Sequence, residues 1–205
     1  MKVLNLYAGI GGNRKLWPDN EIEVTAVEIN PDIAKIYQDF FPDDKMIVGD
    51  AHQYLLEHYK EFDFIWSSPP CQSHSKFRYL NDKKIYPNLS LYQEIILLGA
   101  FAKNKWVVEN VIPYYKPLIA GTEAGRHMFW SNFVIRGFNR TPGNPNKNYT
   151  YKDYERLYNI NLSGYNLKGF DRRKILRNCV VPELGLHIFN SMDNQGLTLD
   201  LKGIA

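Results

Sequence analysis

Short apolar runs alternate with segments of helical spacing along the first two thirds of the chain. The runs are rich in β-branched and aromatic residues and predict strands over 2–7, 23–28, 45–48, 62–67, 105–109 and 128–135. Between them, apolar residues at helical spacing predict helices over 31–40, 51–59 and 89–101. This alternation is typical of βαβ units, so we expect an α/β fold with a doubly wound, mostly parallel sheet.

The apolar pattern is lost between residues 136 and 168 and returns over 175–189. The interval includes RTPGNPNKNYTYKDY, which predicts a lobe or an ordered loop. Its basic and aromatic residues suit contacts with phosphates and bases, but they suit a solvated insertion equally well. We therefore divide the chain into a sheet domain (1–135), a short lobe (136–170) and a segment that returns to the sheet domain (171–205).

The composition is that of an ordinary folded protein, with 44% hydrophobic and 23% charged residues. A net charge of +3 permits a polyanionic partner without identifying one. Cys71 and Cys179 are too far apart in the sequence to suggest a disulfide framework and suit a reducing compartment. No signal-peptide pattern or bilayer-spanning run is evident, so we expect a cytoplasmic protein without a membrane partner.

Candidate ligand-binding residues follow the first three predicted strands. The first strand runs into Ala8-Gly9-Ile10-Gly11-Gly12, where a ligand could approach the backbone closely, although these glycines could also serve a tight turn alone. Glu28 ends the second strand and could accept hydrogen bonds from ribose hydroxyls, and Asp50 follows the third and could accept one from an adenine amino group. Both acids could instead cap the following helices.

A candidate nucleophile follows the fourth strand. Pro69 and Pro70 stiffen the chain before Cys71, and Glu109 ends the fifth strand at the same expected edge of the sheet. His74 raises the alternatives of a metal site or a thiol protease pair, but the five histidines are scattered and no metal is expected. A carboxylate raises the pKa of a neighbouring thiol, so the pair suits chemistry on a base better than simple thiolate activation.

The segments LYAGIGG, VEIN, GDA, SSPPCQSHS, VVENV and RNCVVPELG together resemble the ordered motifs of the DNA cytosine-C5 methyltransferases. The resemblance covers almost the whole chain except 136–168. It implies a Rossmann-like, S-adenosylmethionine-dependent methyltransferase fold with a small recognition lobe. The implied reaction transfers a methyl group from S-adenosylmethionine to C5 of a cytosine flipped out of duplex DNA, through a covalent bond between Cys71 and C6.

The resemblance also implies roles for individual residues. Cys71 would be the nucleophile and Glu109 the acid at cytosine N3. Gln72 and Ser75 would contact DNA. The implied cofactor-binding residues are Tyr7, Gly9, Gly11, Glu28, Ile29, Asp50, Ala51, Pro70, Leu91, Asn178 and Val180.

The sequence departs from the family in two places. The family usually carries a Q-x-R-x-R segment whose arginine holds the cytosine O2, and here Arg126 is the candidate, with His127 as an alternative one residue away. Second, the region between that segment and RNCVVPELG is short. A small recognition lobe makes few contacts with base edges, so we expect a short target sequence, relaxed specificity or help from a second subunit.

Three other functions were weighed against DNA methylation. A subgroup of the same family modifies transfer RNA, so an RNA cytosine-C5 methyltransferase is the nearest rival. A catalytically inactive DNA-binding relative is disfavoured because Cys71, Glu109, Glu28 and Asp50 are all present. An unrelated dinucleotide oxidoreductase is disfavoured by the glycine spacing. The sequence does not decide whether a cognate restriction endonuclease is a partner.

Overall fold

The computed structural model describes residues 1–75, 86–138, 149–167 and 169–194. Within them, seven strands form one sheet in the order β3-β2-β1-β4-β5-β7-β6. Strands β1 to β5 run parallel, whereas β7 is antiparallel to both β5 and β6. The strands are β1 (Lys2–Leu6), β2 (Glu23–Glu28), β3 (Lys45–Val48), β4 (Phe64–Ser67), β5 (Lys105–Val111), β6 (Thr122–Ala124) and β7 (His127–Ser131).

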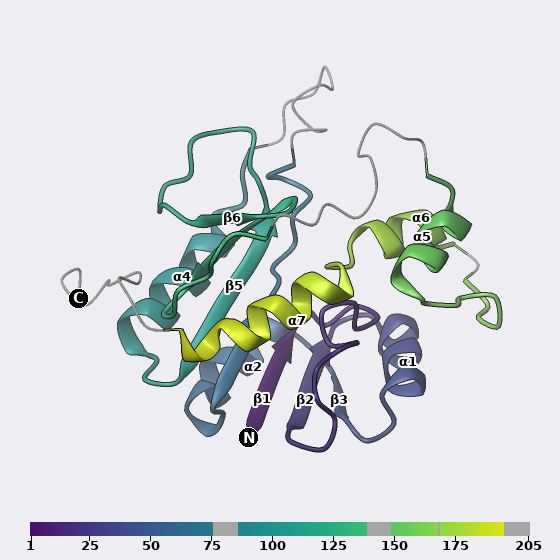
Figure 1. The fold of residues 1–205 in the computed structure, drawn as a ribbon, viewed down its shortest axis with the longest axis horizontal. Coiled ribbons are helices and arrows are strands. Elements are labelled where there is room, and N and C mark those ends of the chain that lie inside the picture. The colour runs from purple at the N-terminus through teal and green to yellow at the C-terminus, as the bar shows by residue number, and fades with distance from the viewer. Residues whose placement is uncertain (76–85, 139–148, 168, 195–205) are drawn as a thin grey trace.

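Helices cover both faces of this sheet (Figure 1). On one face, α1 and α7 pack against strand residues such as Val3, Phe64 and Trp66, and on the other, α2 and α4 pack against Leu4 and Ile65. Neighbouring strand residues therefore point to opposite cores, as the pleat requires. The helices are α1 (Pro31–Phe40), α2 (Ala51–His58), α4 (Ser90–Phe101), α5 (Tyr151–Tyr158), α6 (Arg172–Arg177) and α7 (Pro182–Asn190), with 3-10 turns η1 (Tyr59–Glu61) and η2 (Ser191–Asp193).

The predicted fold class, α/β with a doubly wound and mostly parallel sheet, is confirmed. Strands β2 and β3 and helix α1 have the predicted bounds. Strand β4 begins two residues later than predicted, β5 continues to Val111, and β7 covers His127–Ser131 instead of 128–135. Strand β6 was not predicted, because its three residues carry no apolar alternation and its pairing with β7 defines it.

The described part of the expected lobe is packed. Helix α5 begins with a capping box between Thr150 and Asp153, and Tyr154 and Tyr158 are buried in the same core as α7. Leu162 is fully buried there too. This part is therefore not a solvated insertion, whereas residues 139–148 lie outside the described part of the chain.

No helix in the described ranges is long and apolar enough to cross a membrane.

Candidate active site

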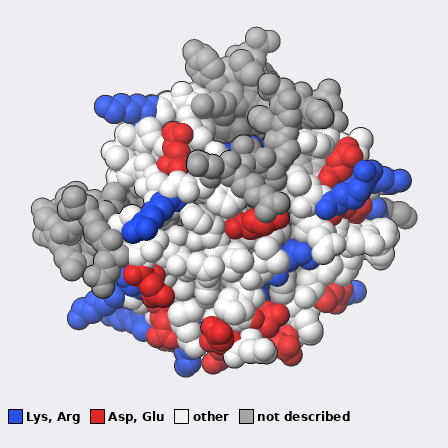
Figure 2. Space-filling model, viewed as in Figure 1, with Lys and Arg blue, Asp and Glu red and all other residues white. Residues whose placement is uncertain are grey.

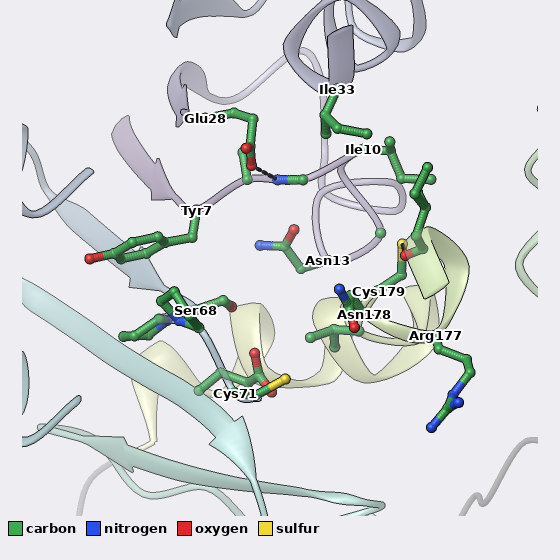
Figure 3. Close-up of a pocket in the computed structure, with 18 of the residues that line it drawn as sticks. Tyr7, Ile10, Asn13, Glu28, Ile33, Ser68, Cys71, Arg177, Asn178 and Cys179 are labelled. Atoms are coloured by element: carbon green, nitrogen blue, oxygen red, sulfur yellow. Dashed lines mark hydrogen bonds between the residues drawn. The ribbon is translucent and has the colours of Figure 1, made fainter. Parts of the chain in front are cut away.

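A cavity of about 290 Å³ opens at the carboxyl ends of the parallel strands, where open α/β sheets bind ligands. Its walls come from the chain after β1, the ends of β2 and β5, the loop after β4, and the connection between α6 and α7. Figure 3 shows Tyr7, Glu28 and Cys71 on different walls. Ten of the predicted site residues line it: Tyr7, Gly9, Glu28, Ile29, Pro70, Cys71, Gln72, Glu109, Asn178 and Val180.

Glu28 holds the turn after β1 in place. Its Oε2 accepts a hydrogen bond of 3.0 Å from the Gly9 amide, and its Oε1 accepts one of 2.9 Å from the Asn30 amide (Figure 3). Tyr7 and Gly9 have positive φ angles of 55° and 54°, so the chain turns sharply there. Each carboxylate oxygen can accept further hydrogen bonds, so Glu28 remains able to bind ribose hydroxyls.

Gly11 has a role in packing instead of lining the cavity. A Cβ at this position would lie 2.2 Å from the Phe41 ring, so a side chain there would clash with the residues after α1. Gly12 is equally constrained, because a Cβ there would lie 2.7 Å from the Val180 carbonyl oxygen. The turn and the α6–α7 connection therefore touch directly, which explains how Val180 reaches the cavity.

Asp50 caps helix α2. Its Oδ1 accepts a hydrogen bond of 2.9 Å from the Gln53 amide, which is the alternative role considered for it above. Asn30 fills the capping position of α1, so Glu28 is not a helix cap. Asp50 and its neighbour Ala51 are not among the cavity-lining residues, whereas Ile29 is, with 68% of its surface exposed.

Buried Glu94, on α4, joins the ends of β1 and β4. It accepts a hydrogen bond of 2.5 Å from the Tyr7 hydroxyl and another from the Ser67 hydroxyl, and His52 lies 3.4 Å away. Burial, followed by the charge of Glu94, raises the pKa of Tyr7, so this hydroxyl stays protonated as the donor. Sequence reasoning missed Glu94, because an acid inside an apolar helix gives no sign of what it faces.

The loop after β4 holds Cys71 on the cavity wall. The side chain of Asn110 donates a hydrogen bond of 2.9 Å to the Pro69 carbonyl, and the amides of His74 and Ser75 donate to the Cys71 carbonyl. Ser75 also pairs with Pro113 in an isolated bridge and does not line the cavity.

The Cys71 thiol is protonated at neutral pH. Burial, and after it the negative charge of Glu109, raises its pKa to about 11, against the smaller opposing effect of Arg177 and Lys174. A resting thiol of this kind needs a proton acceptor or a polarised substrate before it can attack. The arrangement therefore differs from a thiol protease pair, in which a histidine lowers the thiol pKa.

Glu109 and His127 form a buried pair across β5 and β7. The distance between Glu109 Oε1 and His127 Nδ1 is 2.5 Å, and the residues are 6% and 7% exposed. Both line the cavity, and His127 Nε2 is buried without a hydrogen-bond partner within the described structure. Arg126 points elsewhere, since its charge acts on the Tyr158 hydroxyl and it does not line the cavity. Of these two neighbours, His127 lines the cavity and Arg126 does not.

Leu91 lies away from the cavity, 2% exposed in the core formed with Tyr92 and Trp130. Several lining residues were missed in the sequence, namely Asn13, Ser68, Arg177 and Cys179. Asn13 is buried, and its side chain donates a hydrogen bond of 2.8 Å to Asn5. Asn5 lies inside β1, and the sequence does not indicate that it pairs with Asn13.

No group of three or more His, Cys, Asp or Glu side chains among the described residues could hold a metal ion.

Comparison with known proteins gives a family for the first half of the chain. Residues 1–113 match the C-5 cytosine-specific DNA methylases. A curated relative, the tRNA (cytosine(38)-C(5))-methyltransferase of Spodoptera frugiperda, is 33% identical over 97 residues, which make up 44% of this chain and 29% of that protein. The chain thus matches less than a third of the length of this relative.

Solved structures with a similar chain path include methyltransferases. The crystal structure of a Spodoptera frugiperda DNMT2 mutant is 28% identical, with a TM-score of 0.38 over 54% of this chain and 35% of that one. A putative DNA modification methyltransferase encoded within an Escherichia coli prophage is 17% identical, with a TM-score of 0.44 over 76% of this chain and 54% of that one.

The matched residues contain both groups that suit chemistry on a base, Cys71 and Glu109, and they include the turn after β1. The family match covers more than half of the sequence. The chain therefore belongs to the C-5 cytosine-specific DNA methylase family, whose members use S-adenosylmethionine.

Proposed function

We propose that this protein methylates C5 of cytosine in DNA, with Cys71 as the covalent nucleophile. The observation that carries the proposal is the presence of Cys71, Glu109 and His127 in one cavity, with a buried nitrogen of His127 that has no hydrogen-bond partner among the described residues. An unpaired polar atom at such a position costs free energy unless a ligand completes it. The Watson–Crick edge of cytosine offers the oxygen and nitrogen acceptors that suit this pair.

The cavity also suits S-adenosylmethionine, which supplies the methyl group when it is bound. The Glu28 carboxylate lies beside the Gly9 amide and can accept the ribose hydroxyls, while Ile29 and Ile33 provide an apolar surface for a flat ring. We assign the cofactor contacts to Tyr7, Gly9, Glu28, Ile29, Asn178 and Val180. The support for Asp50, Ala51, Gly11 and Leu91 is weaker, because these four lie outside the lining.

Cytosine C5 is a weak nucleophile, so the protein must first activate the ring. In the proposed mechanism the Cys71 sulfur forms a bond with C6 while its proton leaves to solvent or a nearby base. Glu109 holds a proton at N3, which neutralises the charge that develops on the ring. His127 orients Glu109 through Nδ1 and donates from Nε2 to the O2 oxygen. After methylation, loss of the C5 proton allows the S–C6 bond to break and returns Cys71.

We assign base binding to His127 instead of Arg126. With the proton of Glu109 at N3, its other oxygen accepts from Nδ1 of His127, so Nε2 can donate to O2 only when His127 carries a proton on each nitrogen. The H127A variant should lower kcat by about 100-fold, whereas the neighbouring R126A variant should change kcat less than threefold. Equal losses in both variants would remove this assignment.

Residues 136–170 are proposed to recognise the target, with 1–135 as the catalytic domain and 171–205 as the segment that returns to it. The described part of the lobe contributes one helix of eight residues, α5. So small a surface makes few contacts with base edges, which supports a short or relaxed target sequence or a second subunit. Gln72 lies in the cavity wall and is proposed to contact DNA beside the flipped base.

An RNA substrate is the second candidate, because the curated relative is a transfer RNA methyltransferase. The two substrates differ in the 2′-hydroxyl group and in helix geometry, which an enzyme can distinguish. Either substrate would use the same cavity and the same residues for the reaction.

The test is covalent trapping with 5-fluorocytosine. The protein is mixed with S-adenosylmethionine and either duplex DNA or transfer RNA containing 5-fluorocytosine, and adducts are analysed on denaturing gels and by mass spectrometry. Fluorine does not leave as a proton does, so a methylated adduct on Cys71 should accumulate with DNA and be absent from the C71S variant. An adduct with RNA alone would replace DNA by RNA in the proposal. No adduct with either would refute the function.

A further inference from the structure

Helix α6 carries four basic residues in its six positions, Arg172, Arg173, Lys174 and Arg177, and Arg172 differs in its surroundings from the pair Lys174 and Arg177. Arg172 faces the lobe, where it donates a hydrogen bond of 3.1 Å to the Tyr165 carbonyl and lies over the Tyr151 ring. Lys174 and Arg177, by contrast, are exposed. They are three positions apart, so they share one side of the helix.

Arg177 lies at the mouth of the cavity, and Lys174 is exposed one turn before it on the same side of α6. Arg177 is one of its lining residues, and Figure 3 shows its side chain extending away from the interior, from the same segment as Asn178. The positive charges of both residues act on the Cys71 thiol and lower its pKa, in opposition to burial and Glu109. Both cations are thus within electrostatic reach of the nucleophile.

A nucleotide seated in this cavity would bring its phosphates to the same place. Its base must reach Cys71, Glu109 and His127, and the sugar then leads outward through the opening. The flanking phosphates therefore lie at the mouth, one sugar away from the base. Two exposed cations on this side of α6 could each neutralise the charge of one phosphodiester group.

We propose that Lys174 and Arg177 bind the backbone phosphates on either side of the target nucleotide. The assignment rests on the proposed function, because it takes a nucleic acid as the substrate. It places the main phosphate contacts on α6 instead of on the basic residues of 136–168. Figure 2 shows basic and acidic side chains interspersed on the side of the molecule where α5 and α6 lie.

Removal of two positive charges from α6 can be compared with removal of two positive charges from the end of the sheet opposite the cavity. The test variant is K174Q/R177Q. The matched control is K45Q/K105Q, because Lys45 and Lys105 are exposed first residues of β3 and β5 and lie at the end of the sheet opposite the cavity. Each double variant lowers the net charge by two, so the global charge effect is the same in both.

The readout is the dependence of affinity on salt, measured by fluorescence anisotropy on a cytosine-containing duplex that the wild type traps in its 5-fluorocytosine form. Each lost phosphate contact reduces the slope of log K against log[salt] by about 0.9 on duplex DNA. K174Q/R177Q should therefore lose about 1.8 and bind roughly 50-fold more weakly at 0.1 M salt. The single variants should each lose about half of this slope. The control should keep the wild-type slope.

The outcomes separate this proposal from the proposed function. If the wild type forms the adduct but K174Q/R177Q has the slope of the control, the phosphate contacts are refuted and the function stands. If the wild type forms no adduct on DNA or RNA, both are refuted. If single-stranded RNA proves to be the substrate, a slope loss of about 1.4 supports the contacts. Unchanged binding of S-adenosylhomocysteine would show that K174Q/R177Q remains folded.

Discussion

Replacement of Glu94 by alanine should destabilise the fold and weaken cofactor binding together. The carboxylate accepts hydrogen bonds from Tyr7 and Ser67, at the ends of the two strands from which the glycine turn and the Cys71 loop begin. Removing it leaves two hydroxyl groups without their acceptor. Tyr7 also loses the bond that supports its positive φ of 55°, a backbone region that non-glycine residues rarely occupy.

The size of the effect follows from these two hydroxyl groups. A buried polar group left unsatisfied costs about 1–3 kcal/mol, so the pair amounts to roughly 2–6 kcal/mol. Two effects reduce this: Tyr7 is only partly buried and can turn toward water, and the cost of burying a carboxylate disappears. We expect a net loss of about 3 kcal/mol, which lowers Tm by roughly 6–12 °C in a chain of this length.

Thermal unfolding and titration with S-adenosylhomocysteine measure the two consequences. Affinity should fall about tenfold in E94A, because the turn that carries Gly9 loses its support. The neighbouring exposed Gln93 gives the control Q93A, whose Tm should stay within about 2 °C of wild type. If E94A unfolds at the temperature of Q93A and binds equally well, the reasoning about this network is wrong.

Three further predictions concern the thiol, one glycine and one ion pair. At pH 8, iodoacetamide should modify Cys71 far more slowly than a free cysteine, since its pKa of about 11 leaves roughly one thiolate in a thousand. The rate should rise as pH approaches 11, and E109Q should accelerate it at pH 8; no change in E109Q would show that the carboxylate does not act on the thiol. Gly185→Ala places a Cβ 2.3 Å from a backbone oxygen and should cost at least 1–3 kcal/mol by denaturant unfolding. Asp44→Ala removes the buried carboxylate that lies 3.0 Å from Arg14 and accepts from the Tyr37 hydroxyl. It should cost about 3 kcal/mol although Asp19 already lies 2.6 Å from Arg14, and a D44A variant that unfolds like wild type would contradict this.

Much of the fold could be predicted because apolar periodicity and helix caps are local. Asn30 and Pro31 predicted the start of α1, and the structure begins the helix there. Helix α5 was missed although Tyr151, Tyr154 and Tyr158 recur at helical spacing, because the polar neighbours hid the pattern. Treating tyrosine as apolar would have found it.

The site was predicted at the strand ends and missed where distant segments meet. Cys71 and Glu109 follow strands directly, so sheet topology alone brings them to one edge. Asp50 also follows a strand, but its side chain caps a helix, and Leu91 lies in the first turn of α4 with its side chain in the core. Sequence gives the position of a residue along the chain more readily than the direction of its side chain. Arg177 was missed because it lies in α6, which does not follow a strand, so reasoning from strand ends did not reach it.

The contact between Gly12 and Val180 has a consequence for the order in which the protein matures during synthesis. The two residues are separated by 168 positions in the sequence, and they lie next to each other in the lining of the cavity. At a synthesis rate of 5–20 residues per second, roughly 10–30 s pass between their appearances. Cys71 is made 109 positions before Val180, so for roughly 5–20 s of this interval the thiol exists while its cavity lacks this wall. Burial of this thiol, and with it resistance to oxidation, is therefore acquired only when the α6–α7 connection docks.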